Sequence, residues 1–180
     1  MGKVLFFGLA GAGKTSIYKK YFLDLPIEEV MDTTPTVLFH VSKPTAKIFG
    51  KETRVVVFDL GGQEAFIHSH LANDSIFGSL SVAIFVIDVS TSNLFDKALW
   101  FFKRAYDKIC AVNEESPVMA ILLHKFDSSL VSSLVPLAQQ ATEMFQNSIP
   151  DLSEQIYRTS VYDESLKIAM DAILEKSIIK

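Results

Sequence analysis

The fold of this chain is decided by the stretch Gly8-Leu9-Ala10-Gly11-Ala12-Gly13-Lys14-Thr15-Ser16. It matches the pattern Gly, four residues, Gly-Lys-Ser/Thr, and it follows a short apolar run that ends at Phe7. Small residues let backbone N–H groups turn inward around phosphate oxygens, and the following helix points its positive end at them. The stretch therefore predicts a phosphate-binding loop for a nucleoside triphosphate. A glycine-rich turn with an accidental lysine is the weaker interpretation.

Two side chains of this loop carry chemistry. Lys14 can bring a positive charge to the β- and γ-phosphates and is a predicted catalytic residue, and the hydroxyl of Thr15 suits a Mg²⁺ ligand. The loop residues predicted to contact nucleotide are Gly8, Ala10, Gly11, Ala12, Gly13, Lys14, Thr15 and Ser16. By itself the loop does not distinguish guanine from adenine.

On either side of the loop, short apolar runs alternate with longer segments of helical period. This pattern predicts an α/β fold of the P-loop NTPase type, with a doubly wound, mostly parallel six-stranded sheet and helices on both faces. The expected strands are 3–7, 37–41, 55–59, 82–88, 118–124 and 156–159, and the expected helices are 14–23, 64–77, 94–112, 134–145 and 164–176. The segment 43–53 is the least defined, because Pro44 calls for a bulge or turn beside an edge strand.

The length and net charge of the chain further limit the class of protein to which it can belong. A chain of 180 residues predicts a single domain over 1–180, and a net charge of −4 gives no reason to expect nucleic acid or an anionic membrane as partner. The lone Cys110 cannot form an internal disulfide, which fits the cytoplasm. The sequence shows no signal peptide, membrane span or lipidation motif, so we expect an internal membrane to be reached only through partners.

A second motif follows the third expected strand, where Asp59-Leu60-Gly61-Gly62-Gln63 stands at its carboxyl end. Asp59 is expected to hold Mg²⁺, through water, at the edge of the sheet where the phosphate loop lies. The N–H of Gly62 can approach the γ-phosphate without a Cβ in the way, and Gln63 can orient the attacking water as a catalytic residue. The alternative is a tight Gly-Gly turn with an exposed glutamine.

Two further loops point to guanine. The carboxylate of Asp127 in His124-Lys125-Phe126-Asp127 can accept two hydrogen bonds from the guanine edge, while Lys125 can lay its stem along the base or ribose. His124 can brace the first loop, contact the base or serve structure alone, and these alternatives stay open. After the sixth strand, a backbone N–H of Ser160 or Val161 can meet the guanine carbonyl oxygen.

Together these residues resemble the Ras-like small GTPases over essentially the whole chain. The segments 33–36 (switch I) and 59–63 (switch II) are similar to Arf-type switches, whereas the His-Lys-x-Asp motif and the segment 158–166 are similar to the Rag/Gtr GTPases. The resemblance implies that Thr36 ligates Mg²⁺ when the γ-phosphate is present, with Thr33 and Thr34 as competing candidates. Rag/Gtr proteins also carry a C-terminal roadblock-type domain for pairing, which this sequence lacks, so pairing through the G domain, as homodimer or heterodimer, stays open.

The resemblance implies a GTP-hydrolysing molecular switch of signalling or trafficking, alternating between GTP and GDP and read by effectors. The arginines are Arg54, Arg104 and Arg158, and none lies in a switch, so we expect slow hydrolysis that needs an activating protein, alongside an exchange protein. One alternative is a GTP-bound scaffold module that does not hydrolyse; a nucleoside kinase is a poorer one. Near switch II, the side chains Phe66, His68, His70 and Phe77 could form a partner face, although ordinary core and solvent roles are the simpler interpretation.

Overall fold

A sheet flanked by helices organises the computed structural model, which describes residues 2–48 and 51–179. The strands run in the order β2-β4-β1-β5-β6-β7, with β3 paired to β4 off this path. Strands β1, β4, β5, β6 and β7 are mutually parallel, while β2 and β3 are antiparallel to β4. Their bounds are β1 Gly2–Phe7, β2 Phe39–Ser42, β3 Thr45–Ile48, β4 Lys51–Leu60, β5 Val82–Asp88, β6 Val118–His124 and β7 Ile156–Thr159.

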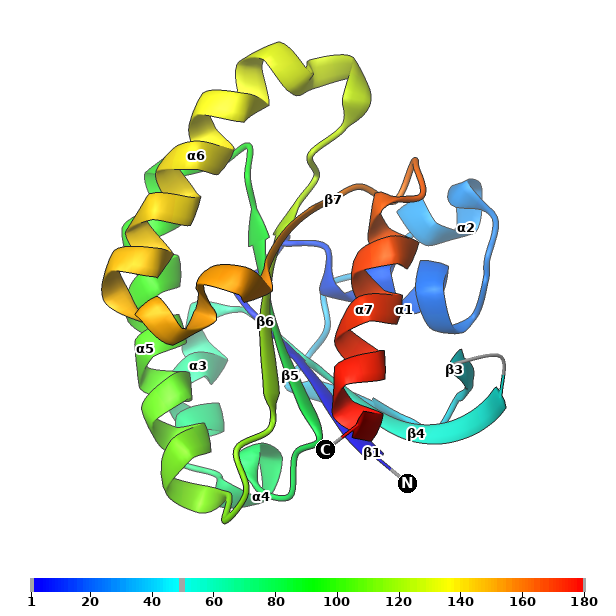
Figure 1. The fold of residues 1–180 in the computed structure, drawn as a ribbon, viewed down its shortest axis with the longest axis vertical. Helices are drawn as coiled ribbons and strands as arrows, with labels where there is room; N and C mark the ends of the chain where they lie inside the picture. The colour runs from blue at the N-terminus through cyan, green and yellow to red at the C-terminus, as the bar shows by residue number, and fades with distance from the viewer. Residues whose placement is uncertain (1, 49–50, 180) are drawn as a thin grey trace.

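Helices cover both faces of the sheet, as Figure 1 shows: α1, α2 and α7 lie on one side and α3, α5 and α6 on the other. The α-helices are α1 Lys14–Phe22, α2 Ile27–Met31, α3 Glu64–Leu71, α4 Asp74–Phe77, α5 Phe95–Val112, α6 Val131–Ser148 and α7 Ser165–Ile179. Short 3-10 turns cover Ser92–Leu94, Ser128–Leu130 and Pro150–Gln155. The predicted doubly wound, mostly parallel α/β fold of the P-loop type is thereby confirmed.

Alternating side chains divide the core into two clusters, one on each face. In β1, Val4 and Phe6 join the cluster beneath α1 and α7, whereas Leu5 and Phe7 join the one beneath α5 and α6. Side chains alternate between the two faces of the sheet, and both faces are buried. For this reason the strands appear in the sequence as continuous apolar runs. The sheet is held between two apolar layers, which fixes the positions of its carboxyl ends.

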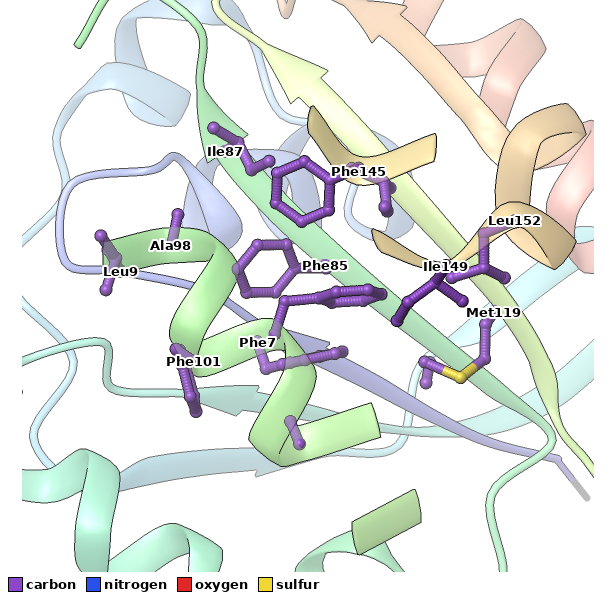
Figure 2. Close-up of a cluster of buried hydrophobic side chains, with 14 of the residues drawn as sticks. Phe7, Leu9, Phe85, Ile87, Ala98, Phe101, Met119, Phe145, Ile149 and Leu152 are labelled. Carbon is purple, nitrogen blue, oxygen red and sulfur yellow. The ribbon is translucent and has the colours of Figure 1, made fainter. Parts of the chain in front are cut away.

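Several aromatic rings pack together on the α5–α6 side of the sheet. The Phe85 ring lies 5.0 Å from the Phe7 ring and 5.9 Å from the Phe145 ring, between centroids. Figure 2 shows these rings beside Phe101 of α5. Burying one such side chain stabilises the fold by about 1.5–3 kcal/mol, so this cluster anchors β1 and β5 directly behind the phosphate-binding loop.

All six expected strands are present, and the structure adds β3. Strand β2 begins at Phe39 rather than at 37, because Leu38 adopts a left-handed φ of 59° that a strand cannot accommodate. Pro44 stands between β2 and β3, where its missing N–H interrupts no pairing, and its carbonyl accepts from the Val55 N–H at 3.1 Å. Part of the poorly defined segment 43–53 is thus a short antiparallel extension, and its residues 49 and 50 lie outside the described ranges.

One predicted helix is split and one helix was missed. The expected helix 64–77 is interrupted at Asn73, whose side chain accepts a hydrogen bond from the Ser75 N–H at 3.1 Å and so caps a new helix, α4. Helix α2 is a single short turn that starts after Pro26, too brief to show a helical period. No helix in 2–48 or 51–179 is long and apolar enough to cross a bilayer.

Candidate nucleotide-binding site

The phosphate-binding loop joins the carboxyl end of β1 to α1 and buries its lysine. Lys14 is only 6% exposed, and its Nζ donates to the carbonyls of Gly8 and Leu9, both at 2.9 Å. Burial lowers the pKa of Lys14 to about 8, and the nearby Asp59 carboxylate opposes that shift. The ammonium group is thus buried and held by carbonyls of its own loop. A phosphate anion beside it would interact with it more strongly than with an exposed lysine.

His124 lies beneath this loop rather than at an exposed base edge. Its ring is 1% exposed, and its Nδ1 lies 3.0 Å from the Thr159 hydroxyl of β7. A Cβ added to Gly13, which has φ 98°, would lie 2.5 Å from the His124 Cδ2. Of the alternatives that the sequence left open, this geometry favours bracing of the loop, and the glycine is required both by backbone conformation and by this contact.

His124 should make stability depend on pH in mildly acidic solution. Burial, the largest cause, and Lys125 lower the pKa of His124 from 6.5 to about 4. The unfolded chain therefore binds more protons between these values, so stability is full above pH 6.5 and falls as pH approaches 4, by on the order of 3 kcal/mol. His124→Asn removes the titrating group, and urea unfolding at several pH values should show a flatter acid profile than that of the parent protein. His68→Asn, at an exposed position of α3, is the matched control; equal profiles for parent and His124→Asn would refute the assignment.

Three oxygen-bearing side chains converge beside the loop. Thr15 Oγ1 donates to Asp59 Oδ2 at 2.6 Å, and the Thr36 hydroxyl lies 3.1 Å from Thr15 Oγ1 and 3.4 Å from Asp59 Oδ2. The other Asp59 oxygen, Oδ1, is buried with no hydrogen-bond partner among the described residues, and burial raises the pKa of this carboxyl. Hard oxygen donors with an unsatisfied carboxylate atom fit Mg²⁺. Thr33 and Thr34 are exposed and line the same cavity without joining this cluster.

A cavity of about 300 Å³ opens between the phosphate-binding loop and both switches. Switch II is docked on the loop through the Ala10 N–H, which donates to the Gly62 carbonyl at 2.9 Å. Gln63 immediately precedes α3, where its side chain lines the cavity. Predicted residues on the cavity wall are Ala10, Gly11, Gly13, Lys14, Thr15, Ser16, Thr36, Gly62, Gln63 and Lys125. Gly8 and Ala12 belong to the loop but do not line it.

The predicted guanine-reading residues meet at the ends of β6 and β7. The Ser160 hydroxyl donates to Asp127 Oδ1 at 2.6 Å, and the Ser160 N–H is taken by the Ser165 hydroxyl at 3.0 Å. The Val161 N–H has no hydrogen-bond acceptor among the described residues, which makes it the better of the two predicted donors. Neither Asp127 nor Val161 lines the cavity described above.

Two supporting residues are not among those predicted from the sequence. Asp88 accepts a hydrogen bond from Lys125 Nζ at 2.6 Å and so holds this lysine at the end of β6. Ser165 orients the Ser160 loop as described. Asp88 could have been found, because it ends β5 at the same edge as the other motifs. The role of Ser165 depends on the turn before α7, which no distinctive sequence pattern predicts.

Fold and site together define a nucleotide-binding protein of the P-loop class with the loop order of small G proteins. Residues 3–180 match the family described as the Gtr1/RagA G protein conserved region. The chain belongs to this family.

Individual relatives agree with the assignment. The chain is 30% identical to Ras-related GTP-binding protein A of Dictyostelium discoideum, over 96% of this chain and 56% of that protein. It is 27% identical to GTP-binding protein gtr1 of Schizosaccharomyces pombe, over 96% and 55%. It is also 36% identical to ADP-ribosylation factor-like protein 3 of Caenorhabditis elegans, over 53% of this chain and 46% of that protein. The chain spans about half the length of the Rag and Gtr relatives that it matches.

Proposed function

We propose that residues 1–180 form a single G domain that binds GTP with Mg²⁺, hydrolyses it to GDP and phosphate, and changes the arrangement of its switches on hydrolysis. The observation that carries this proposal is the meeting of Thr15, Thr36 and Asp59, which joins the phosphate-binding loop, switch I and the strand leading into switch II. A ligand that binds all three stabilises one arrangement of the switches, and its loss releases them.

The proposed chemistry divides among residues of the chain. Thr15, Thr36 and Asp59 would hold Mg²⁺, which when bound offsets charge on the β- and γ-phosphates. Lys14 adds a positive charge beside them, and Gln63 orients the attacking water. Asp127 and the Val161 N–H would read guanine, with Lys125 held alongside by Asp88. Positioning and electrostatic stabilisation therefore account for the catalysis we propose.

Thr15→Asn should weaken GTP binding by roughly 10- to 100-fold, and GDP binding less, since the lost hydroxyl ligates the ion that bridges the β- and γ-phosphates. Titration of each nucleotide with and without Mg²⁺ measures the difference. Thr45→Asn, at an exposed position of β3 outside the cavity, is the matched control for the substitution. Equal losses for GTP and GDP would count against a Mg²⁺ role for Thr15.

Hydrolysis by the isolated chain should be slow, on the order of 10⁻⁴ to 10⁻³ per second, because no arginine is supplied in cis. Arg54 lies in β4, Arg104 is exposed on α5, and the Arg158 guanidinium stacks on the Phe126 ring at 5.3 Å. Single-turnover phosphate release on the purified protein tests the rate. A value above about 10⁻² per second would show that a catalytic group has been missed, and release that never exceeds the solution background would favour the non-hydrolysing scaffold.

An activating partner should raise this rate by roughly 10³-fold or more by completing the stabilisation of charge. Gln63→Leu should abolish most of the stimulated rate while GTP binding persists, since the amide positions water rather than nucleotide. Partners that read the switches can be sought by comparing proteins captured by the GTP-analogue and GDP states, in a cytoplasmic extract and on internal membranes. Identical sets would argue against a switch.

A further inference from the structure

The peptide between Gly61 and Gly62 lies within switch II, and its carbonyl is held by a side chain that the proposed chemistry does not use. The Gly61 carbonyl oxygen lies 3.1 Å from Nε2 of His70, on α3. On its other side, the Gly61 N–H donates to the Leu38 carbonyl at 2.6 Å. Gly61 is therefore fixed from both directions, by α3 and by the residue that leads from switch I into β2.

The hydrogen bond from His70 has a geometric consequence for the next residue. No described peptide bond is cis, and in a trans peptide the C=O and the following N–H point in opposite directions. With the Gly61 carbonyl directed at His70, the Gly62 N–H is directed away from α3. Gly62 is buried and lines the cavity, and its N–H donates to no described protein group. The Gly62 N–H is thus an oriented hydrogen-bond donor without an acceptor among the described residues, and it lies where the γ-phosphate is expected.

The His70 ring is suited to this task. It is 2% exposed, on the same inner face of α3 as Ile67, and the Phe66 ring lies 6.3 Å away between centroids. A carbonyl oxygen carries no hydrogen, so Nε2 must carry it, and burial lowers the pKa of His70 in favour of the neutral ring. Without this donor, the Gly61 carbonyl would be a buried polar group lacking its hydrogen bond, which would destabilise this arrangement.

The conformation of Leu38 points the same way. A leucine with φ 59° is strained, and its carbonyl is held by the Gly61 N–H. Leu38, which follows switch I, Gly61 of switch II and His70 of α3 thus share one hydrogen-bonded unit. Rotation of the Gly61–Gly62 peptide would break it.

We propose that His70 is a positioning residue for recognition of the γ-phosphate: by holding the Gly61 carbonyl, it aims the Gly62 N–H into the nucleotide cavity. The inference rests on the proposed function and adds to it a determinant of the preference for GTP over GDP. His70 touches neither nucleotide nor metal and acts through the backbone alone. GDP lacks the group that this N–H would meet, so its binding does not depend on the orientation of the peptide.

Paired substitutions test the proposal. His70→Phe keeps a ring and removes the donor, His70→Gln keeps an N–H at a similar reach, and His68→Phe makes the same change at an exposed site on the same helix. Dissociation of a fluorescent non-hydrolysable GTP analogue and of fluorescent GDP is measured for each in the presence of Mg²⁺. We expect His70→Phe to release the GTP analogue roughly tenfold faster and GDP at an unchanged rate, with His70→Gln and His68→Phe close to the parent.

Equal acceleration for both nucleotides, no change for either, or failure of His70→Gln to restore the parent behaviour would overturn the inference. A parent protein that binds neither nucleotide would instead refute the proposed function, and the inference with it. A measurement on the unmodified protein covers the case in which His70→Phe does not fold. ¹⁵N NMR of His70 should show hydrogen on Nε2, and a ring with hydrogen only on Nδ1 would contradict the proposal.

Discussion

Replacing Asp127 by asparagine should lower the affinity for GTP by roughly 100- to 1000-fold and raise the affinity for xanthosine triphosphate. A carboxylate offers acceptors to both the ring N–H and the exocyclic amino group of guanine. An amide offers one acceptor and one donor, so its NH₂ group opposes the guanine amino group and suits the oxygen that xanthine carries there.

The variant should keep the surrounding structure. The Ser160 hydroxyl, which donates to Asp127 Oδ1 at 2.6 Å, can donate equally to an asparagine oxygen. Asp107→Asn, at an exposed position of α5, is the matched control for loss of one negative charge. Competition binding with GTP, xanthosine triphosphate and ATP provides the measurement, and an unchanged affinity for GTP would remove Asp127 from the base site.

Gly62→Ala should lower the intrinsic rate of hydrolysis by roughly 100-fold or more, because it prevents switch II from docking on the phosphate-binding loop. The added Cβ would lie 2.3 Å from the Gly8 carbonyl oxygen, 2.3 Å from the Leu9 carbonyl carbon and 2.4 Å from the Ala10 nitrogen. These are backbone atoms, which no side-chain rotation can relieve. The hydrogen bond from the Ala10 N–H to the Gly62 carbonyl would be lost with the contact.

GDP binding should persist in this variant, since the loop around Lys14 remains intact. Gly78→Ala is the matched control: its Cβ would come no nearer than 3.2 Å to another residue, the Asp74 carbonyl oxygen, at an ordinary φ of −86°. Single-turnover phosphate release, together with GTP and GDP affinities, distinguishes the two variants. Hydrolysis at the parent rate in Gly62→Ala would show that the docked arrangement of switch II is not required.

The sequence was most informative about candidate functional residues that lie at or just after the carboxyl end of a buried strand. The strand before Gly8, the strand that carries Asp59 near its carboxyl end and the strand ending at His124 contain apolar runs flanked by glycine or charge, so their approximate ends were predictable. Parallel strands bring those ends to one edge, which is why the loops could be expected to meet. The candidate site was thus predictable from local pattern and topology.

Other features depended on tertiary contacts that no local pattern reveals. The choice of Thr36 over Thr33 and Thr34 rests on the hydroxyl that reaches Asp59, a contact between residues distant in the chain. The left-handed Leu38 is held by Gly61, and a leucine gives no sequence signal for that conformation. From the sequence alone, an ordinary core or solvent role was the simpler interpretation of His70, because only the structure shows that its ring contacts the Gly61 carbonyl oxygen.

Displacement of fluorescent GDP from the purified protein in the presence of Mg²⁺ tests the central claim most directly. GTP and GDP should each displace the probe at a stoichiometry of one nucleotide per chain, and ATP in large excess should not, because Asp127 and the Val161 N–H match the guanine edge alone. Displacement by ATP as readily as by GTP, or absence of nucleotide binding in the folded protein, would contradict it.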